Sequence, residues 1–258
     1  MRLSDFYKDV IGLSSTGDPY LSGFGANFDF AFVWFKPFQR ISSARVTDFQ
    51  PWVNVQLRRS DGRPYQELER LLLDEGEIWS WDYVAKQMEL KNIGEVEIAE
   101  SSTWGHLTEE YRRPDLAKKI IDFQEIHNLE EIHDNILESY ELRYIYQLLK
   151  DAGFDHIIQF DIAWGDEDLK NQKYALAEAP DFVQLPRTQY CSNSNVDFAI
   201  TTYFGDFHAV IHGPNKLADA IRRSSIFEGF FCNELTVCDW YFDVENQMGE
   251  RKYIAPPH

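Results

Sequence analysis

Cysteine is scarce in this chain, and its scarcity already separates two classes of protein. Only three of the 258 residues are cysteines, at positions 191, 232 and 238. An odd and sparse set of cysteines is typical of proteins kept in a reducing compartment, not of disulfide-stabilised secreted domains. A chain of this length also buries enough surface to fold without covalent or metal cross-links. We therefore expect free thiols and a cytoplasmic location.

Basic residues are also in short supply. The chain has 25 Lys and Arg residues against 43 Asp and Glu residues, which gives a net charge of −18. Nucleic acids and anionic membrane surfaces both attract basic patches, so neither is an expected partner. A strongly acidic surface instead favours association with a basic protein.

Long apolar runs, a secretion signal, internal repeats and Gly/Ser-rich linkers are all missing. The longest unbroken apolar run covers residues 30–35, whereas a helix that spans a bilayer needs about 20 residues. Asp5, Lys8 and Asp9 interrupt the N-terminal region, where a signal peptide would need an apolar run of roughly 7–15 residues. We expect no membrane span, and a single domain over residues 28–250 preceded by an irregular extension over residues 1–27.

Motifs that identify a reaction are absent as well. The chain contains no G-x-S-x-G, no H-E-x-x-H, no P-loop and no G-x-G-x-x-G after a strand. Cys191 has no recognisable base in the sequence that would generate a thiolate. The sequence therefore indicates no cofactor and identifies no catalytic residue.

Aromatic side chains, by contrast, are abundant: 19 Phe, 13 Tyr and 7 Trp make up 15% of the chain. This content excludes a disordered chain. Most of the rings should fill the core, because large aromatic side chains dominate buried area. The remainder would suit a protein-binding surface with an acidic rim.

Hydrophobic periodicity predicts both helices and strands. Helices are expected at residues 63–73, 81–90, 103–113 and 216–223, and two more within 115–152 that separate near His127-Asn128, with Ser80 and Gly153 as caps. Strands are expected at residues 28–35, 51–57, 95–99, 156–160, 174–177, 196–203, 207–212, 227–232 and 236–242. Gly229 inside an aromatic strand predicts a bulge or a close backbone approach. Together these elements favour an α+β fold with a mostly antiparallel sheet flanked by helices.

Pairs that contain histidine are the candidates for a metal site. Three pairs share one face of a helix or strand: His106 with Glu110, Glu130 with His133, and His208 with His212. Such groups bind metals when three or more of them converge, and His127, Asp197 and Asp206 are further candidates. For each pair the simpler interpretation is a hydrogen-bonded histidine, a solvated helix surface or an ordinary face of an edge strand.

Two acidic clusters also stand out. Seven acids lie between Asp122 and Glu141 with no Lys or Arg among them, and we interpret them as a solvated or partner-facing helix surface. Four more follow the predicted strand at 156–160, namely Asp161, Asp166, Glu167 and Asp168. They would suit Ca²⁺ or Mg²⁺, or form a plain acidic turn.

Several short segments are shared with a known family. They are Phe35-Lys36-Pro37-Phe38, residues 95–99, residues 110–114, Tyr144-Ile145-Tyr146 leading to Gly153-Phe154, and residues 228–233 with Thr236-Val237 and Trp240 behind them. On these segments the chain resembles the YwbB-like family of uncharacterised Bacillus-type bacterial proteins (domain of unknown function 2711) over most of residues 30–242. Cys238-Asp239 departs from the family's tighter run into the tryptophan. The resemblance implies a cytoplasmic bacterial protein and transfers no catalytic residue.

Two functions from different classes follow from these observations. The first is a non-enzymatic cytoplasmic binding or interaction protein, one form of which is an immunity-type protein that neutralises a basic toxin. The second is a metal-assisted hydrolase that uses the histidine and carboxylate candidates above. Convergence of three or more of those side chains in one cleft would favour the second function.

Overall fold

A computed structural model describes most of the chain. The described residues are 18–19, 28–40, 63–104, 109, 112–129, 137–160, 172–185, 190–202, 208–233, 236–238 and 253–254. Of the predicted extension over residues 1–27, only Asp18–Pro19 is described, and it forms a short strand, β1, paired with β11 (Val237–Cys238). The strand predicted at 51–57 and the end of the one at 236–242 lie outside the described residues.

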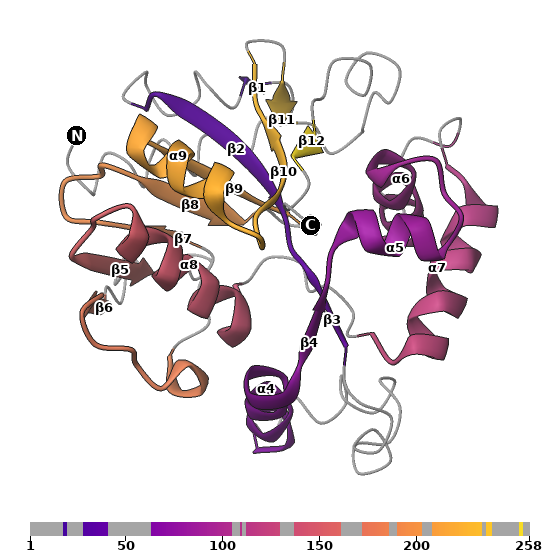
Figure 1. The fold of residues 1–258 in the computed structure, drawn as a ribbon, viewed down its shortest axis with the longest axis horizontal. Coiled ribbons are helices and arrows are strands. Elements are labelled where there is room, and N and C mark those ends of the chain that lie inside the picture. Colours follow the sequence, from indigo (N-terminus) through magenta and orange to yellow (C-terminus); the bar gives the residue numbers. More distant parts are fainter. Residues whose placement is uncertain are drawn as a thin grey trace.

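An eight-stranded sheet forms the centre of the molecule (Figure 1). Its strands, in spatial order, are β12 (Tyr253–Ile254), β10 (Glu228–Phe231), β2 (Phe30–Phe35), β9 (His208–Gly213), β8 (Ala199–Thr202), β7 (Tyr190–Ser192), β5 (His156–Phe160) and β6 (Gln172–Ala175). Every neighbouring pair is antiparallel. The chain continues from β2 into β3 (Phe38–Arg40), which pairs with β4 (Glu77–Trp79) in a separate ribbon.

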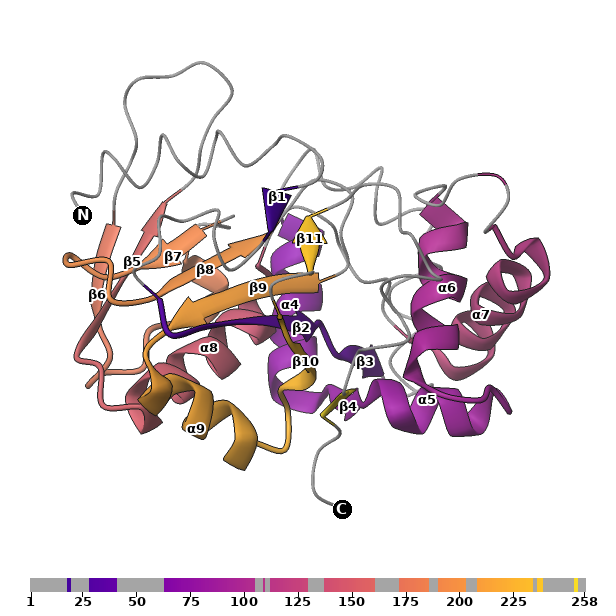
Figure 2. The same ribbon diagram turned by 90° about the horizontal axis from the view of Figure 1, so that it is seen from above.

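Two helices, α8 (Ser139–Asp151) and α9 (Asn215–Arg223), cover one face of this sheet, and Figure 2 shows them side by side beneath the strands. A third helix, α4 (Arg63–Glu75), packs on α8, and its Leu71 and Leu72 join the same apolar cluster. The buried side of α8, which includes Leu142, Ile145 and Leu149, packs with apolar residues of β2, β8 and β9. A short 3₁₀ helix, η1 (Phe182–Gln184), contacts α8 and α4. This packing leaves the opposite side of α8 facing outward.

The other three helices gather beyond the β3–β4 ribbon (Figure 1). They are α5 (Trp81–Gln87), α6 (Ile93–Trp104) and α7 (Pro114–His127). A second apolar cluster joins them to the opposite face of β2, where Phe35 stacks on Trp81 with ring centroids 4.6 Å apart. The α+β fold with an antiparallel sheet flanked by helices is therefore confirmed.

Local signals placed most helix ends correctly. Ser80 caps α5 by accepting a hydrogen bond from the backbone N–H of Tyr83 at 3.0 Å. Pro114 is the first residue of α7, and Asn128 ends that helix in the left-handed conformation. Gly153 follows α8 with φ of 77°, a conformation that glycine adopts at low cost. At 215–223 the cap is Pro214, and Asn215 is the first helical residue.

One prediction near residue 100 is wrong. Residues 95–99 belong to α6 and not to a strand, because Ile93, Val96 and Ala99 recur at the three-residue step of a buried helical stripe. Glu97 is buried as well, so α6 lacks the polar face that marks a surface helix in a sequence. Of the helix expected at 103–113, residues 103–104 belong to the end of α6, residues 109 and 112–113 are not helical, and the rest lie outside the described residues.

Gly229 behaves as the glycine pattern predicted. Its φ is 152°, and a Cβ atom there would overlap the carbonyl oxygen of Val33 on the neighbouring strand. The close approach of the β10 and β2 backbones therefore requires glycine at this position.

Candidate functional site

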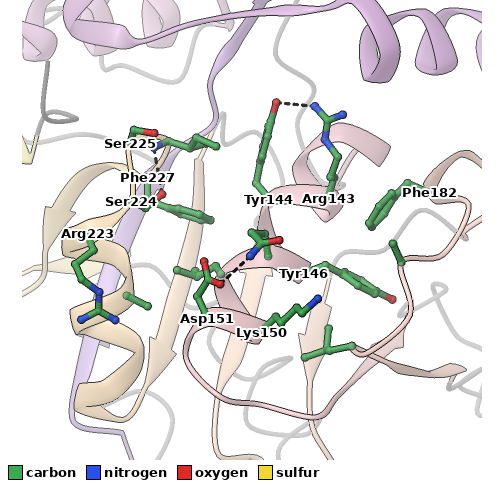
Figure 3. A pocket seen from close by; sticks show the side chains of 16 residues that line it. Arg143, Tyr144, Tyr146, Lys150, Asp151, Phe182, Arg223, Ser224, Ser225 and Phe227 are labelled. Carbon is green, nitrogen blue, oxygen red and sulfur yellow. Dashed lines mark hydrogen bonds between the residues drawn. The ribbon is translucent and has the colours of Figure 1, made fainter.

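An open groove of about 800 Å³ runs along the outward side of α8 (Figure 3). One wall comes from the segment between β6 and η1, and the other from the end of α9 and the residues that lead into β10. The residues that line it are Arg143, Tyr144, Tyr146, Gln147, Leu148, Lys150, Asp151, Leu176, Ala179, Phe182, Ala220, Arg223, Ser224, Ser225, Ile226 and Phe227.

Helical spacing explains the polar floor of the groove. Arg143, Gln147 and Lys150 recur at steps of four and three residues, which places them on one side of α8. Leu142, Ile145 and Leu149 occupy the other side and are buried. The amphipathic pattern that buries α8 against the sheet thus also presents this polar row to the groove.

Arg143 is held in place by two hydrogen bonds. One guanidinium nitrogen donates to the carbonyl oxygen of Leu73 at 2.6 Å, and another donates to the hydroxyl oxygen of Tyr144 at 3.1 Å. The guanidinium carbon also lies 5.2 Å from the centre of the Tyr144 ring. A basic group fixed on a helix in this way is suited to positioning a ligand, because little rotamer freedom remains to be lost on binding.

Aromatic rings form the apolar part of the lining. Phe182 stands edge-on to Tyr146, with ring centroids 5.2 Å apart and an interplanar angle of 87°. Phe227 packs on Trp34 of the sheet at 4.7 Å. The groove therefore combines rings anchored in the core with charged groups, which is the usual composition of a small-molecule site.

A second, more polar cavity of about 620 Å³ lies at the β7–β8 turn. His156 lies beside it, with Nδ1 2.6 Å from Asp155 Oδ1 and Nε2 2.9 Å from Ser194 Oγ. The backbone N–H of Ser194 donates to the same Nε2 atom at 3.2 Å, so this nitrogen acts as an acceptor that fixes the β7–β8 turn. Asp155 is 91% exposed, and His156 lowers the pKa of its carboxyl through their hydrogen bond. This trio acts as a clamp on the turn and not as a catalytic triad, whose carboxylate is buried and whose imidazole is free to take the serine proton.

Only three of the predicted histidine ligands lie among the described residues. His208 and His212 are buried on β9, an interior strand, so the edge-strand interpretation is wrong. Burial lowers the pKa of His212 to about 3, which keeps its imidazole neutral. His127 packs against the rings of Phe123 and Trp79 at 4.4 and 5.2 Å. His106, Glu110, Glu130 and His133 lie outside the described residues, as do Asp206 and residues 161–168.

Within the described ranges, no group of three or more His, Cys, Asp or Glu side chains is placed to hold a metal ion. Neither Cys191 nor Cys232 forms a disulfide in that part of the chain. Cys191 is fully buried, and its burial raises the pKa of the thiol, which disfavours a thiolate nucleophile. No helix in the same ranges is long and apolar enough to cross a bilayer.

The prediction of a solvated acidic helix surface is wrong at its C-terminal end. Glu138 and Glu141 are both buried. They form a capping box at the start of α8, in which the side chain of each residue accepts a hydrogen bond from the backbone N–H of the other. Glu141 also pairs with Lys36 at 3.6 Å, and both side chains are fully inaccessible. Glu125, near the start of the same acidic stretch, is exposed as expected.

Sequence reasoning missed two buried charges that join distant elements. Lys36 lies between the aromatic residues of β2 and β3, and Glu228 begins β10. The carboxylate of Glu228 accepts hydrogen bonds from the backbone N–H groups of Trp81 and Asp82, at 2.5 and 2.8 Å. The signal that could have revealed them was a single charged residue within a short aromatic stretch, a position that water rarely reaches.

Comparison with known protein families gives a match over most of the chain. Residues 16–242 match the model of a family described as "Protein of unknown function (DUF2711)". No curated protein and no solved structure matches the chain.

Proposed function

The chain belongs to the DUF2711 family, and we propose that it is a non-enzymatic binding protein whose ligand occupies the groove along α8. The observation that carries the proposal is the groove itself, which has a volume of about 800 Å³ and a mixed aromatic and charged lining. Sites with this composition on rigid elements are the usual binding sites for small molecules.

The lining supports binding without catalysis. Among the described residues that line the groove there is neither a histidine nor a cysteine. The hydroxyl oxygen of Ser224 accepts a hydrogen bond from the backbone N–H of Ile226 at 3.2 Å, which orients this side chain toward its own loop. A serine nucleophile would need a neighbouring base to remove its proton, and the carboxylate of Asp151 in the lining is instead hydrogen-bonded to the Gln147 side chain at 2.7 Å.

The experiment is a fragment screen followed by amide chemical-shift mapping. Neutral and charged aromatic fragments should perturb the backbone amides of residues 143–151 and 223–227 more than those elsewhere. The Ala179→Trp variant places a bulky ring in the groove and should abolish these shifts. Ala177→Trp is the matched control, because Ala177 is equally exposed but does not line the groove.

Two results would overturn the proposal. One is a screen in which no fragment perturbs these amides. The other is a set of perturbations that survives Ala179→Trp unchanged, since the fragments would then be bound somewhere else.

A second candidate is supported by the net charge of −18, which exceeds what solubility requires of a protein this size. An acidic surface steers basic partners, so an interaction protein, in its specific form an immunity-type protein that neutralises a basic toxin, is compatible with this charge. Its test is a stoichiometric complex with a basic protein of the native host that persists at physiological salt. Association that is non-stoichiometric and lost at physiological salt would count against it.

A further inference from the structure

We propose that the groove along α8 selects a small anionic ligand, in which a phosphate or carboxylate group is attached to a flat ring. This inference rests on the proposed binding function and adds the chemical class of the ligand. It follows from three basic side chains that line the groove, those of Arg143, Lys150 and Arg223.

Basic residues elsewhere in this acidic chain are commonly neutralised. Within the described ranges, carboxylates pair with Arg40, Arg70, Lys86, Lys91, Arg113, Lys118 and Arg222, at distances between 2.5 and 3.4 Å. With an excess of 18 negative charges in the chain, pairing of this kind is the expected state of an exposed Lys or Arg.

The three groove cations, like Lys119, Lys173 and Lys216, pair with no carboxylate in the part of the chain that the structure describes, but they differ from those lysines in lining one groove together. Asp151 is the one acidic residue among the lining residues that the structure describes, and it accepts a hydrogen bond from the Gln147 side chain at 2.7 Å. The groove is thus a local region of positive charge on an acidic protein. Charge-assisted hydrogen bonds from such groups are the usual means of holding phosphate and carboxylate.

Helix ends account for only part of this arrangement. Lys150 and Arg223 lie in the last turns of α8 and α9, where basic residues also offset the negative end of the helix dipole. Arg143 lies near the start of α8, where the dipole of that helix disfavours a cation. One of its guanidinium nitrogens instead donates to the carbonyl oxygen of Leu73 in the last turn of α4. Its other hydrogen bond is to the neutral hydroxyl of Tyr144, so an anionic ligand in the groove would supply the opposite charge that these two partners do not.

The rings of the lining indicate the second feature of the ligand. Figure 3 shows Arg143 between the side chains of Tyr144 and Phe182. A flat ring that enters the groove beside Arg143 would meet aromatic faces and edges there. A charged group on that ring would then lie within reach of the basic side chains on the floor.

The experiment compares ligands that share a ring and differ in whether they carry an anionic group. Isothermal titration at low salt would measure adenosine 5′-monophosphate against adenosine, and benzoate against benzyl alcohol. We expect at least one anionic member to bind about tenfold more tightly than its neutral partner, as for a charge-assisted hydrogen bond. The two pairs also separate phosphate from carboxylate as the preferred group.

Charge-removing variants locate the binding. Lys150→Gln and Arg223→Gln should each weaken the anionic ligand by up to about fivefold, as expected for exposed ion pairs. Arg222→Gln is the control, because Arg222 has the same charge on the same helix but pairs with Asp219 and lies outside the lining. The Arg222→Gln variant should bind the anionic ligand as tightly as the unmodified protein does.

The possible failures are distinct. Equal binding of the neutral and anionic members, or equal loss in the Arg222→Gln control, would overturn the anionic class and leave the binding function standing. Absence of binding by every probe, together with a negative fragment screen, would overturn both.

Discussion

Glu228 should make the stability of this protein fall as the pH rises from mildly acidic values to neutrality. Burial raises the pKa of its carboxyl from 4.5 to about 7, although hydrogen bonds from the backbone N–H groups of Asp82 and Trp81 act in the opposite direction. The charged side chains that face it are those of Asp82 and Lys86. The folded state therefore binds this proton more tightly than the unfolded state does.

The size of the effect follows from proton linkage. Below pH 4.5 the carboxyl is protonated in both states, and its ionisation costs no stability. Between pH 4.5 and about 7 the unfolded chain loses the proton while the folded chain keeps it, so the free energy of unfolding decreases. A difference of about 2.5 pH units corresponds to about 3 kcal/mol, and above pH 7 the full cost is present.

Urea unfolding at several pH values between 5 and 8, followed by tryptophan fluorescence, would measure this slope. In the Glu228→Gln variant, the decrease in the free energy of unfolding with pH should be smaller by about 3 kcal/mol than in the unmodified protein. It also adds an offset of about 1–3 kcal/mol that does not depend on pH, because an amide oxygen can satisfy only one of the two backbone donors well. The slope, and not the stability at one pH, is therefore the quantity to compare.

Glu125→Gln is the control, since Glu125 is exposed on α7 and should leave the slope unchanged. The same pH slope in Glu228→Gln and in the unmodified protein would refute the argument, because it would mean that the buried carboxyl has the same pKa in both states.

Three further predictions concern the core and the metal hypothesis. Phe230→Ala should lower the free energy of unfolding by about 3–5 kcal/mol, because the ring is 2% exposed and packs against the β2 strand; an unchanged urea midpoint would contradict its burial. Lys36→Met should cost about 3–5 kcal/mol by leaving the Glu141 carboxylate buried without its cation, and adding Glu141→Gln should recover part of that loss in the same assay. Elemental analysis of the purified protein should find no stoichiometric zinc, manganese or iron; finding one that is lost in Glu130→Gln with His133→Gln would favour the metal-assisted hydrolase instead.

The fold was largely predictable because its signals are local. Ser80 caps α5 by accepting a hydrogen bond from the backbone N–H of Tyr83, only three residues away. Gly153 follows α8 in a left-handed conformation that depends on its own backbone. The Gly229 prediction succeeded for a similar reason, since a glycine inside an aromatic strand usually marks a bulge or a close backbone approach. The failure at residues 95–99 shows the limit, because α6 buries charged residues such as Glu97 as well as its apolar stripe, and its sequence therefore lacks the polar face that would mark a helix.

The candidate site was not predictable, because its parts belong to separate elements. The basic residues at 143, 150 and 223 carry no distinguishing pattern in the sequence and become a site only where α8 and α9 lie side by side. By itself the sequence determined the acidic charge, the aromatic core and most helix ends, which depend on composition or on neighbours a few residues away. Tertiary structure alone decided that Glu228 reaches a backbone donor 147 residues away, that Glu141 is buried against Lys36, and that three basic groups surround one groove. Contacts of this kind depend on how the helices and strands pack together. That packing decides whether a side chain is buried and which charge it meets, and the neighbouring residues in the sequence do not.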